Sequence, residues 1–188
     1  MKKMMMIAVM LVATLAANAQ QDPGTWSITP KVGVNLANLA GDVDGNSMKF
    51  GLVAGADAMY QISPVIGLSA GLFYSMQGAE FKGDAKAKYD FLNIPVLANF
   101  YVAPGLALKA GLQPSLAVSA KEKAGDYEVD VKDYMQSIIL DVPLGISYEF
   151  SDFVIDARYN LGLTKLNKGD GSIRNSVIQF TVGYKIPF

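Results

Sequence analysis

Apolar and polar residues alternate along most of this chain. Eight stretches place an apolar residue at every second position: 26–36, 50–61, 66–75, 92–100, 106–119, 138–150, 153–164 and 176–188. In the last stretch, Ile178 and Phe180 alternate with Gln179 and Thr181. A period of two is typical of β-strands, because successive side chains point to opposite faces of a sheet. The pattern therefore predicts eight strands.

The last stretch keeps its alternation up to the final residue, Phe188. In a water-soluble protein, a strand edge of this kind would promote aggregation. We therefore expect the apolar face of this strand to meet lipid, and its edge to close against the first strand.

The connections between the predicted strands alternate in length. Short turns fall at 63–65, 103–105 and 151–152, and longer polar links fall at 40–48, 78–88, 121–133 and 167–175. Short turns at one rim and long loops at the other are typical of transmembrane barrels. The stretches also exceed the roughly 9–11 residues that a tilted spanning strand needs. The predicted fold is all-β: an eight-stranded antiparallel up-and-down transmembrane β-barrel with short periplasmic turns and longer extracellular loops.

The chemistry of the two strand faces predicts which one meets the membrane. One face is apolar and uninterrupted, and the other is small, polar and charged, the reverse of a soluble lipocalin-like barrel. We expect the polar face to fill the narrow interior, where eight strands leave room only for packed side chains. Aromatic residues of the apolar face should form two girdles, one at the turn rim (Trp26, Tyr60, Phe100, Phe150, Phe153 and Phe188) and one at the loop rim (Phe50, Tyr74 and Tyr134).

One hairpin is expected to project beyond the membrane. The alternation continues through 128–134, but its outward positions change from charged to apolar at Tyr134. We therefore expect the strands over 106–119 and 138–150 to extend past the bilayer as an exposed hairpin. The connection 121–133 would then serve as a contact edge.

The N-terminus has the features of a secretory signal peptide. Lys2 and Lys3 precede an apolar run of about fourteen residues and the small-residue site Ala17-Asn18-Ala19. We expect cleavage after Ala19, which predicts a signal peptide at 1–19 and a barrel domain at 20–188. The sequence has no cysteine, so the signal is not of the lipoprotein type.

Composition narrows the class of partner. Removing 19 of the 188 residues, Lys2 and Lys3 among them, leaves 169 residues and changes the net charge from −1 to −3. This balance argues against a nucleic-acid partner, which would require a basic patch. No later segment has the ~18 uninterrupted apolar residues of a spanning helix, so membrane attachment would be by sheet.

The predicted interior carries a balanced set of charges: Lys31, Lys109, Arg158 and Lys185 against Asp57, Asp141, Glu149 and Asp156. Because an unpaired buried charge is costly, this balance predicts a salt-bridge network that blocks the lumen. A proton or ion path is the alternative. A regular hairpin through 151–152 would place Arg158 opposite Gly145, with Asp156 and Glu149 as its nearest anions. Of the eight charged residues, Arg158 is therefore expected to contribute most to the stability of the network.

Catalytic and metal-binding motifs are weak. The chain has no histidine and no cysteine, so the histidine base of outer-membrane barrel hydrolases is missing. A Ser-Lys or paired-carboxylate scheme is the alternative, but no nucleophile motif supports one, and we predict no catalytic residue, no cofactor and no enzymatic activity. Asp42 and Asp44 are spaced like part of a calcium loop, but the later bidentate glutamate is missing. An ordinary hairpin loop without a metal is expected there.

The sequence resembles the small OmpA/OmpX-like outer-membrane barrels, in the form common in Bacteroidetes and often labelled porin-family proteins. The resemblance covers the whole mature chain. It is most specific in F-L-N-I-P-V-L-A-N-F-Y at 91–101, in A-R-Y-N-L-G-L at 157–163 and in the aromatic C-terminal strand. It implies assembly in the outer membrane through periplasmic chaperones and an insertion machinery that reads the last strand, with Tyr184, Ile186 and Phe188 as the insertion signal. It does not imply an activity.

These features predict an integral outer-membrane β-barrel with a packed, charge-paired lumen and a structural or surface-interaction role, such as adhesion or envelope stabilisation. The alternative is a narrow pore or transporter for small or apolar solutes. The expected surroundings are outer-membrane lipid and lipopolysaccharide, and the expected state is a monomer. The sequence identifies no extracellular partner.

Overall fold

A computed structural model describes residues 22–43, 45–81, 85–124 and 127–188. The expected signal peptide and Asp44 lie outside the described residues. Almost all of the described chain is β-strand, and its single helix is one 3-10 turn, η1 (Lys132–Tyr134). None of the described helical structure is long or apolar enough to cross a membrane.

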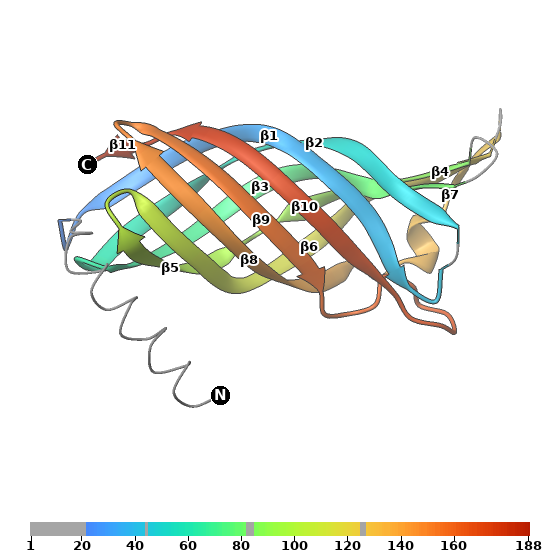
Figure 1. The fold of residues 1–188 in the computed structure, drawn as a ribbon. Coiled ribbons are helices and arrows are strands. Elements are labelled where there is room, and N and C mark those ends of the chain that lie inside the picture. Colours follow the sequence, from blue (N-terminus) through green and yellow to red (C-terminus); the bar gives the residue numbers. More distant parts are fainter. Residues whose placement is uncertain (1–21, 44, 82–84, 125–126) are drawn as a thin grey trace, which may run out of the picture.

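The strands follow one another along the chain with few interruptions (Figure 1). They are β1 (Trp26–Gly41), β2 (Asn46–Ser63), β3 (Ile66–Phe81), β4 (Lys86–Asn93), β5 (Val96–Ala103), β6 (Leu106–Ala124), β7 (Tyr127–Asp130), β8 (Ile138–Phe150), β9 (Phe153–Gly162), β10 (Ile173–Tyr184) and β11 (Ile186–Pro187).

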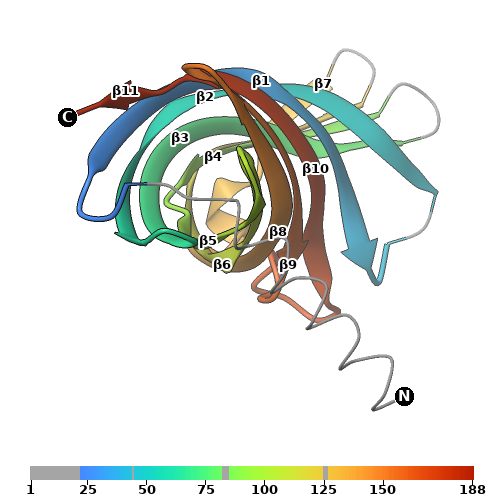
Figure 2. The same cartoon turned by 60° about the vertical axis from the view of Figure 1, so that its left-hand side comes forward.

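The sheet closes into a barrel with eight wall segments, as predicted, and we call each segment, whether one strand or two strands in line, a stave. Neighbouring staves pair antiparallel around the ring, in the order β1, β2, β3, β4 with β5, β6, β8, β9 and β10, and β7 pairs with the end of β6. The ring closes where β10 pairs with β1, from Lys31↔Gly183 to Gly41↔Ile173. β4 and β5 form one stave, because both pair with β3 and β6, and β10 and β11 form another, because both pair with β1. Figure 2, which looks more nearly along the axis, shows the ring. Closure removes the free edge that the last strand would otherwise expose.

The fourth stave is interrupted at Ile94 and Pro95 because proline has no N–H to donate to the ladder. Backbone bonds from Ile94 N to Pro114 O (2.8 Å) and from Gly71 N to Pro95 O (2.9 Å) bridge the interruption. The stretch 92–100 therefore remains a single wall element, although its regular pairing is broken once.

The two rims differ in the way the sequence predicts. The tight turns between β2 and β3, β5 and β6, and β8 and β9 lie at one end, the turn rim, together with both ends of the barrel domain (Figure 1). The longer connections lie at the other end, the loop rim.

Large apolar side chains cover the outer surface of the barrel. Val32, Leu52, Leu72, Leu112 and Ile155 are each about half exposed. At the turn rim, Phe150, Phe153 and Phe188 point outward and Trp26 packs on Tyr60 with the ring centroids 4.8 Å apart. At the loop rim, Phe50 and Tyr74 point outward, whereas Tyr134, expected in the same girdle, lies in η1 and is exposed at the barrel mouth. This arrangement is typical of a barrel surrounded by lipid, with a girdle of aromatic side chains at each membrane interface.

Four strands extend beyond the rest of the loop rim, and we call this part the extension sheet. It comprises the end of β3, the start of β4, the end of β6, and β7, with pairings such as Glu80↔Lys86, Lys86↔Lys123 and Lys123↔Glu128. The expected hairpin of 106–119 with 138–150 is therefore wrong in part. β6 does project, but beyond Ser119 its partners are β4 and β7. β8 pairs with β6 only between Leu106 and Leu116 and begins at Ile138, after η1.

The inward and outward faces of β6 exchange at a bulge. Asp90 pairs with Ser119 but Phe91 pairs with Ala117, so Val118 is an extra residue in the β6 ladder. An extra residue shifts every later side chain to the opposite face. Ala120 is consequently buried and Ser119 is not, the reverse of what an unbroken alternation over 106–119 predicts.

Candidate functional site

The interior near the turn rim holds a cluster of five charged side chains around Asp156. Lys109 Nζ lies 2.6 Å and Lys31 Nζ 3.6 Å from Asp156 Oδ2, and Arg158 Nε lies 2.7 Å from Oδ1. Lys31 also contacts Asp57 at 2.8 Å. All five side chains are buried. One carboxylate therefore joins three cations that come from β1, β6 and β9.

Glycines opposite these long side chains give them room. Gly145 lies opposite Arg158, as the sequence predicts, and a β-carbon added to Gly145 would approach Arg158 Cγ to 2.5 Å. Gly183 stands in the same relation to Lys31, with an added β-carbon 2.5 Å from Lys31 Cγ. Because Gly145 and Gly183 have no side chain, the aliphatic parts of Arg158 and Lys31 have room to extend across the lumen.

The surroundings of Arg158 differ from the expectation in two respects. Asp156 does pair with it, but Glu149 does not. Its guanidinium instead lies over the ring of Phe73, with Cζ 5.6 Å from the ring centroid, a distance suited to a cation–π contact. Asp156, which bonds three cations, is therefore the centre of the cluster rather than Arg158.

A second charged group closes the turn rim. Lys185 Nζ donates to Glu149 Oε2 at 2.7 Å, and the buried hydroxyl of Tyr101 donates to Glu149 Oε1 at 2.6 Å. No ion pair of the described residues joins this group to the Asp156 cluster. The eight predicted residues therefore form two clusters and one isolated member.

The isolated member is Asp141. Its carboxylate is buried and accepts hydrogen bonds from Gln113 (3.3 Å) and Ser115 (3.2 Å), and no Lys or Arg among the described residues pairs with it. It belongs to a layer of buried amides and hydroxyls across the middle of the lumen: Asn35, Ser75, Gln77, Asn93, Gln113, Ser115, Asn160, Asn175 and Gln179. The expectation that it joins an ion pair is wrong for the described part of the chain.

The interior near the loop rim is apolar, contrary to the prediction of a small, polar and charged inner face. Its buried members are Leu39, Ala79, Ala87, Tyr89, Phe91, Ala120, Met135, Ile139 and Leu166. We call this group the apolar plug. Leu39, Tyr89, Phe91 and Ile139, like Phe73 and Tyr101 below, have the same parity as the inward polar residues of their own strands, so the parity of the pattern could have located them.

Two loops supply the top of the apolar plug. Met135 and Leu166 come from the connections before β8 and after β9, and both are buried. The loops are joined by backbone bonds from Gln136 N to Leu166 O (2.7 Å) and from Lys168 N to Tyr134 O (3.0 Å). The plug is thus held from above as well as by the barrel wall.

The outward face of the extension sheet carries a lysine array: Lys86 and Lys88 on β4, directly opposite Lys123 and Lys121 on β6. Glu80 pairs with Lys86 (3.0 Å) and Glu128 with Lys121 (2.8 Å). The hydrogen bond from the Lys121 ammonium holds the pKa of the exposed Glu128 carboxyl below its usual range. The expected contact edge 121–133 therefore lies beside a face of mixed charge.

The loop that resembled a calcium site is used differently. Asp42 Oδ2 accepts a hydrogen bond from Ser172 N at 2.8 Å and so joins the first and last loops. Within the described ranges, no group of three or more acidic side chains could hold a metal ion.

The residues expected to signal membrane insertion lie on the outer surface of the closing stave. Tyr184, Ile186 and Phe188 all point outward and are at least two-fifths exposed. Phe188 N donates to Trp26 O at 2.9 Å, so the last residue is paired with the first strand.

Comparison with known proteins places this architecture. A family model described as "Outer membrane protein beta-barrel domain" matches residues 18–168. Among solved structures, Ail, the attachment invasion locus protein of Yersinia pestis, in complex with the heparin analogue sucrose octasulfate, matches at 16% identity and a TM-score of 0.57, over 88% of this chain and 100% of Ail. Neisserial surface protein A matches at 17% identity and a TM-score of 0.51, over 87% and 97%. None of the curated proteins matches significantly.

Proposed function

The chain belongs to the outer membrane protein beta-barrel domain family, and from this premise we propose that it is a non-conducting surface protein with an adhesive or envelope-stabilising role. The observation that carries the proposal is the filling of the lumen at three levels. The Asp156 cluster, the amide layer and the apolar plug follow one another along the axis, and their side chains are buried. A barrel filled in this way offers the cell two surfaces, one toward lipid and one toward the medium.

We assign the contact role to the extension sheet. Lys86 faces Lys123 and Lys88 faces Lys121 across β4 and β6. Like charges placed directly opposite each other destabilise a sheet. Glu80 and Glu128 offset this repulsion for Lys86, Lys88 and Lys121, whereas no carboxylate of the described residues lies within 4.0 Å of the Lys123 ammonium. The position of the lysine array beyond the rest of the loop rim would bring it first to an anionic surface outside the cell, or to the phosphate groups of lipopolysaccharide around the barrel.

Export and assembly complete the proposal. Residues 1–19 would be removed as a signal peptide, and periplasmic chaperones and the barrel-insertion machinery would deliver the chain as a monomer. The outward face of Tyr184, Ile186 and Phe188 is suited to recognition before the barrel closes. No enzymatic activity is proposed.

The closed lumen predicts that purified protein in planar bilayers shows no steady single-channel conductance and does not accelerate the swelling of liposomes in small sugars. The reason is that ions would have to cross buried side chains at all three levels. A barrel of the same family with a known open pore serves as the positive control in the same lipid. A steady, voltage-independent conductance from the parent protein would reject the non-conducting role in favour of the pore.

The contact role predicts that liposomes containing the protein are retained on a heparin-coated surface, and that Lys86→Gln with Lys123→Gln lowers retention several-fold. Heparin is the probe because one structure with a similar fold, Ail, is a complex with a heparin analogue. The control, Lys165→Gln with Lys168→Gln, removes the same charge from a loop outside the extension sheet. Equal retention of the two double variants would refute the role of the lysine array.

A further inference from the structure

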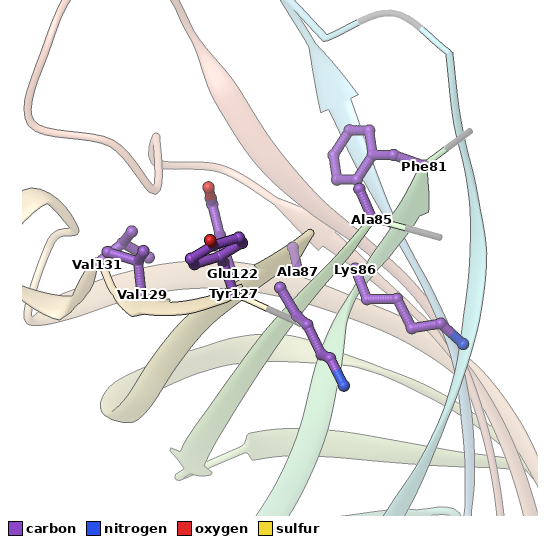
Figure 3. Close-up of a pocket in the computed structure, with 9 residues that line it drawn as sticks. Phe81, Ala85, Lys86, Ala87, Glu122, Tyr127, Val129 and Val131 are labelled. Atoms are coloured by element: carbon purple, nitrogen blue, oxygen red, sulfur yellow. The ribbon is translucent and has the colours of Figure 1, made fainter. Parts of the chain in front are cut away.

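The face of the extension sheet opposite the lysine array is apolar and hollow. A cavity of about 360 Å³ lies between the hairpin of β3 with β4 and the end of β6 with β7 (Figure 3). Its lining includes Phe81, Ala85, Ala87, Tyr127, Val129 and Val131. This volume is within the range of small-molecule sites, and a mostly apolar lining is typical of them.

A second cavity, of about 250 Å³, lies next to the first toward the barrel mouth. Tyr89, Tyr134, Met135 and Leu166 are among its lining residues, so its floor is the apolar plug. The two cavities share Glu122 and Val131. The two cavities are therefore adjacent, and we call them together the hollow; Glu122 is the acidic side chain that both share.

Glu122 is placed to recognise a ligand. The hydroxyl of Tyr89 donates to Glu122 Oε1 at 2.8 Å, and no Lys or Arg of the described ranges lies within 4.0 Å of the carboxylate. Lys86 and Lys123 also line the first cavity. The ammonium of Lys86 pairs with Glu80 and points away from Phe81 and Tyr127 (Figure 3), and neither lysine forms an ion pair with Glu122. The carboxylate thus faces an apolar, aromatic-lined space with one hydrogen bond from a neutral group.

We propose that this hollow binds a small molecule with an apolar body and a protonated amine. Glu122 would accept a charge-assisted hydrogen bond from the ammonium. The rings of Tyr89, Tyr127 and Tyr134 suit the same group, because aromatic faces attract cations. The apolar body would cover Phe81, Val129 and Val131. This ligand site is additional to the adhesive role and uses the other face of the same sheet.

The test uses the full barrel in lipid nanodiscs and three probes of one shape: phenylbutylamine, phenylbutanol and phenylbutyrate. Calorimetric titration, corrected with empty nanodiscs, should show saturable binding of the amine about tenfold tighter than that of the alcohol or the acid. Glu122→Gln should reduce the affinity for the amine to that for the alcohol. Glu128→Gln, on the opposite face of the sheet, should leave the preference unchanged.

A second variant separates ligand binding from a structural role of Glu122. Val131→Trp, which places a large ring in the part shared by both cavities, should abolish saturable binding of all three probes while the carboxylate remains. Equal affinities of the parent for the three probes, no saturable binding of the amine, or the same loss in Glu128→Gln as in Glu122→Gln would each overturn the proposal.

Discussion

Asp156→Asn should lower the free energy of unfolding by at least about 3–5 kcal/mol, the usual effect of breaking a buried ion pair. Asp156 is 1% exposed and contacts Lys31, Lys109 and Arg158. Asparagine keeps the shape but removes the charge, so three cations would remain buried with only Asp57 to offset them. The measurement is urea unfolding in lipid vesicles, followed by loss of the heat-modifiable band on gels.

The neighbouring variants rank the members of the cluster. Arg158→Ala should cost less than Asp156→Asn, because Asp156 keeps Lys31 and Lys109 after the change. Asp156→Asn with Lys109→Met should recover part of the loss, since one uncompensated cation is removed and contacting residues are energetically coupled.

The control is Asp152→Asn, which makes the same chemical change at an exposed turn and should alter stability by no more than about 0.5 kcal/mol. If Asp152→Asn and Asp156→Asn had the same effect, the cluster would not be a stabilising unit.

Gly33→Val should prevent the barrel from closing and leave the chain outside the membrane fraction. Gly33 lies at the seam, opposite Thr181 of β10 and Val53 of β2. A β-carbon there would approach Thr181 Cα to 2.7 Å and overlap the carbonyl oxygen of Phe180. These are backbone atoms of β10, which cannot move aside without breaking the pairing of β1 with β10. The measurement is the fraction of protein that resists extraction from outer membranes and keeps its heat-modifiable mobility.

The matched control is Gly169→Val, in the loop after β9. Nothing lies within 4 Å of an added β-carbon at Gly169, so the same substitution should leave assembly at the parental level. Parental amounts of membrane-embedded Gly33→Val would show that the seam tolerates a side chain and that the close approach at Gly33 does not control closure.

The sequence predicted those features of the lumen that depend on residues close together in the chain. The parity of Lys31, Lys109, Asp156 and Arg158 placed them inside, and the two-residue turn at 151–152 placed Gly145 opposite Arg158. It did not show that Asp156 would meet Lys31. These residues lie on different staves that are not adjacent, so their contact depends on how far the strands are staggered around the ring.

The outer end of the barrel was less predictable. One extra residue at Val118 reversed the faces of β6, and it left no signal in the composition. Because of this shift, Glu122 lies on the inner face of the extension sheet with Ala87 and Tyr89, and Lys121 lies on the outer face. The alternation by itself would have placed Glu122 on the outer face.

By itself, the sequence determined the class of structure: eight alternating stretches, short and long connections in turn, and an apolar face that only lipid could cover. These are properties of single strands and single turns, because each depends on residues within about a dozen positions. The tertiary structure alone decided that one carboxylate holds three cations, that Met135 and Leu166 close the mouth, and that a hollow forms around Glu122. The physical reason is that closing the ring fixes the registers between strands, and only those registers bring side chains from distant parts of the chain to the same level of the lumen.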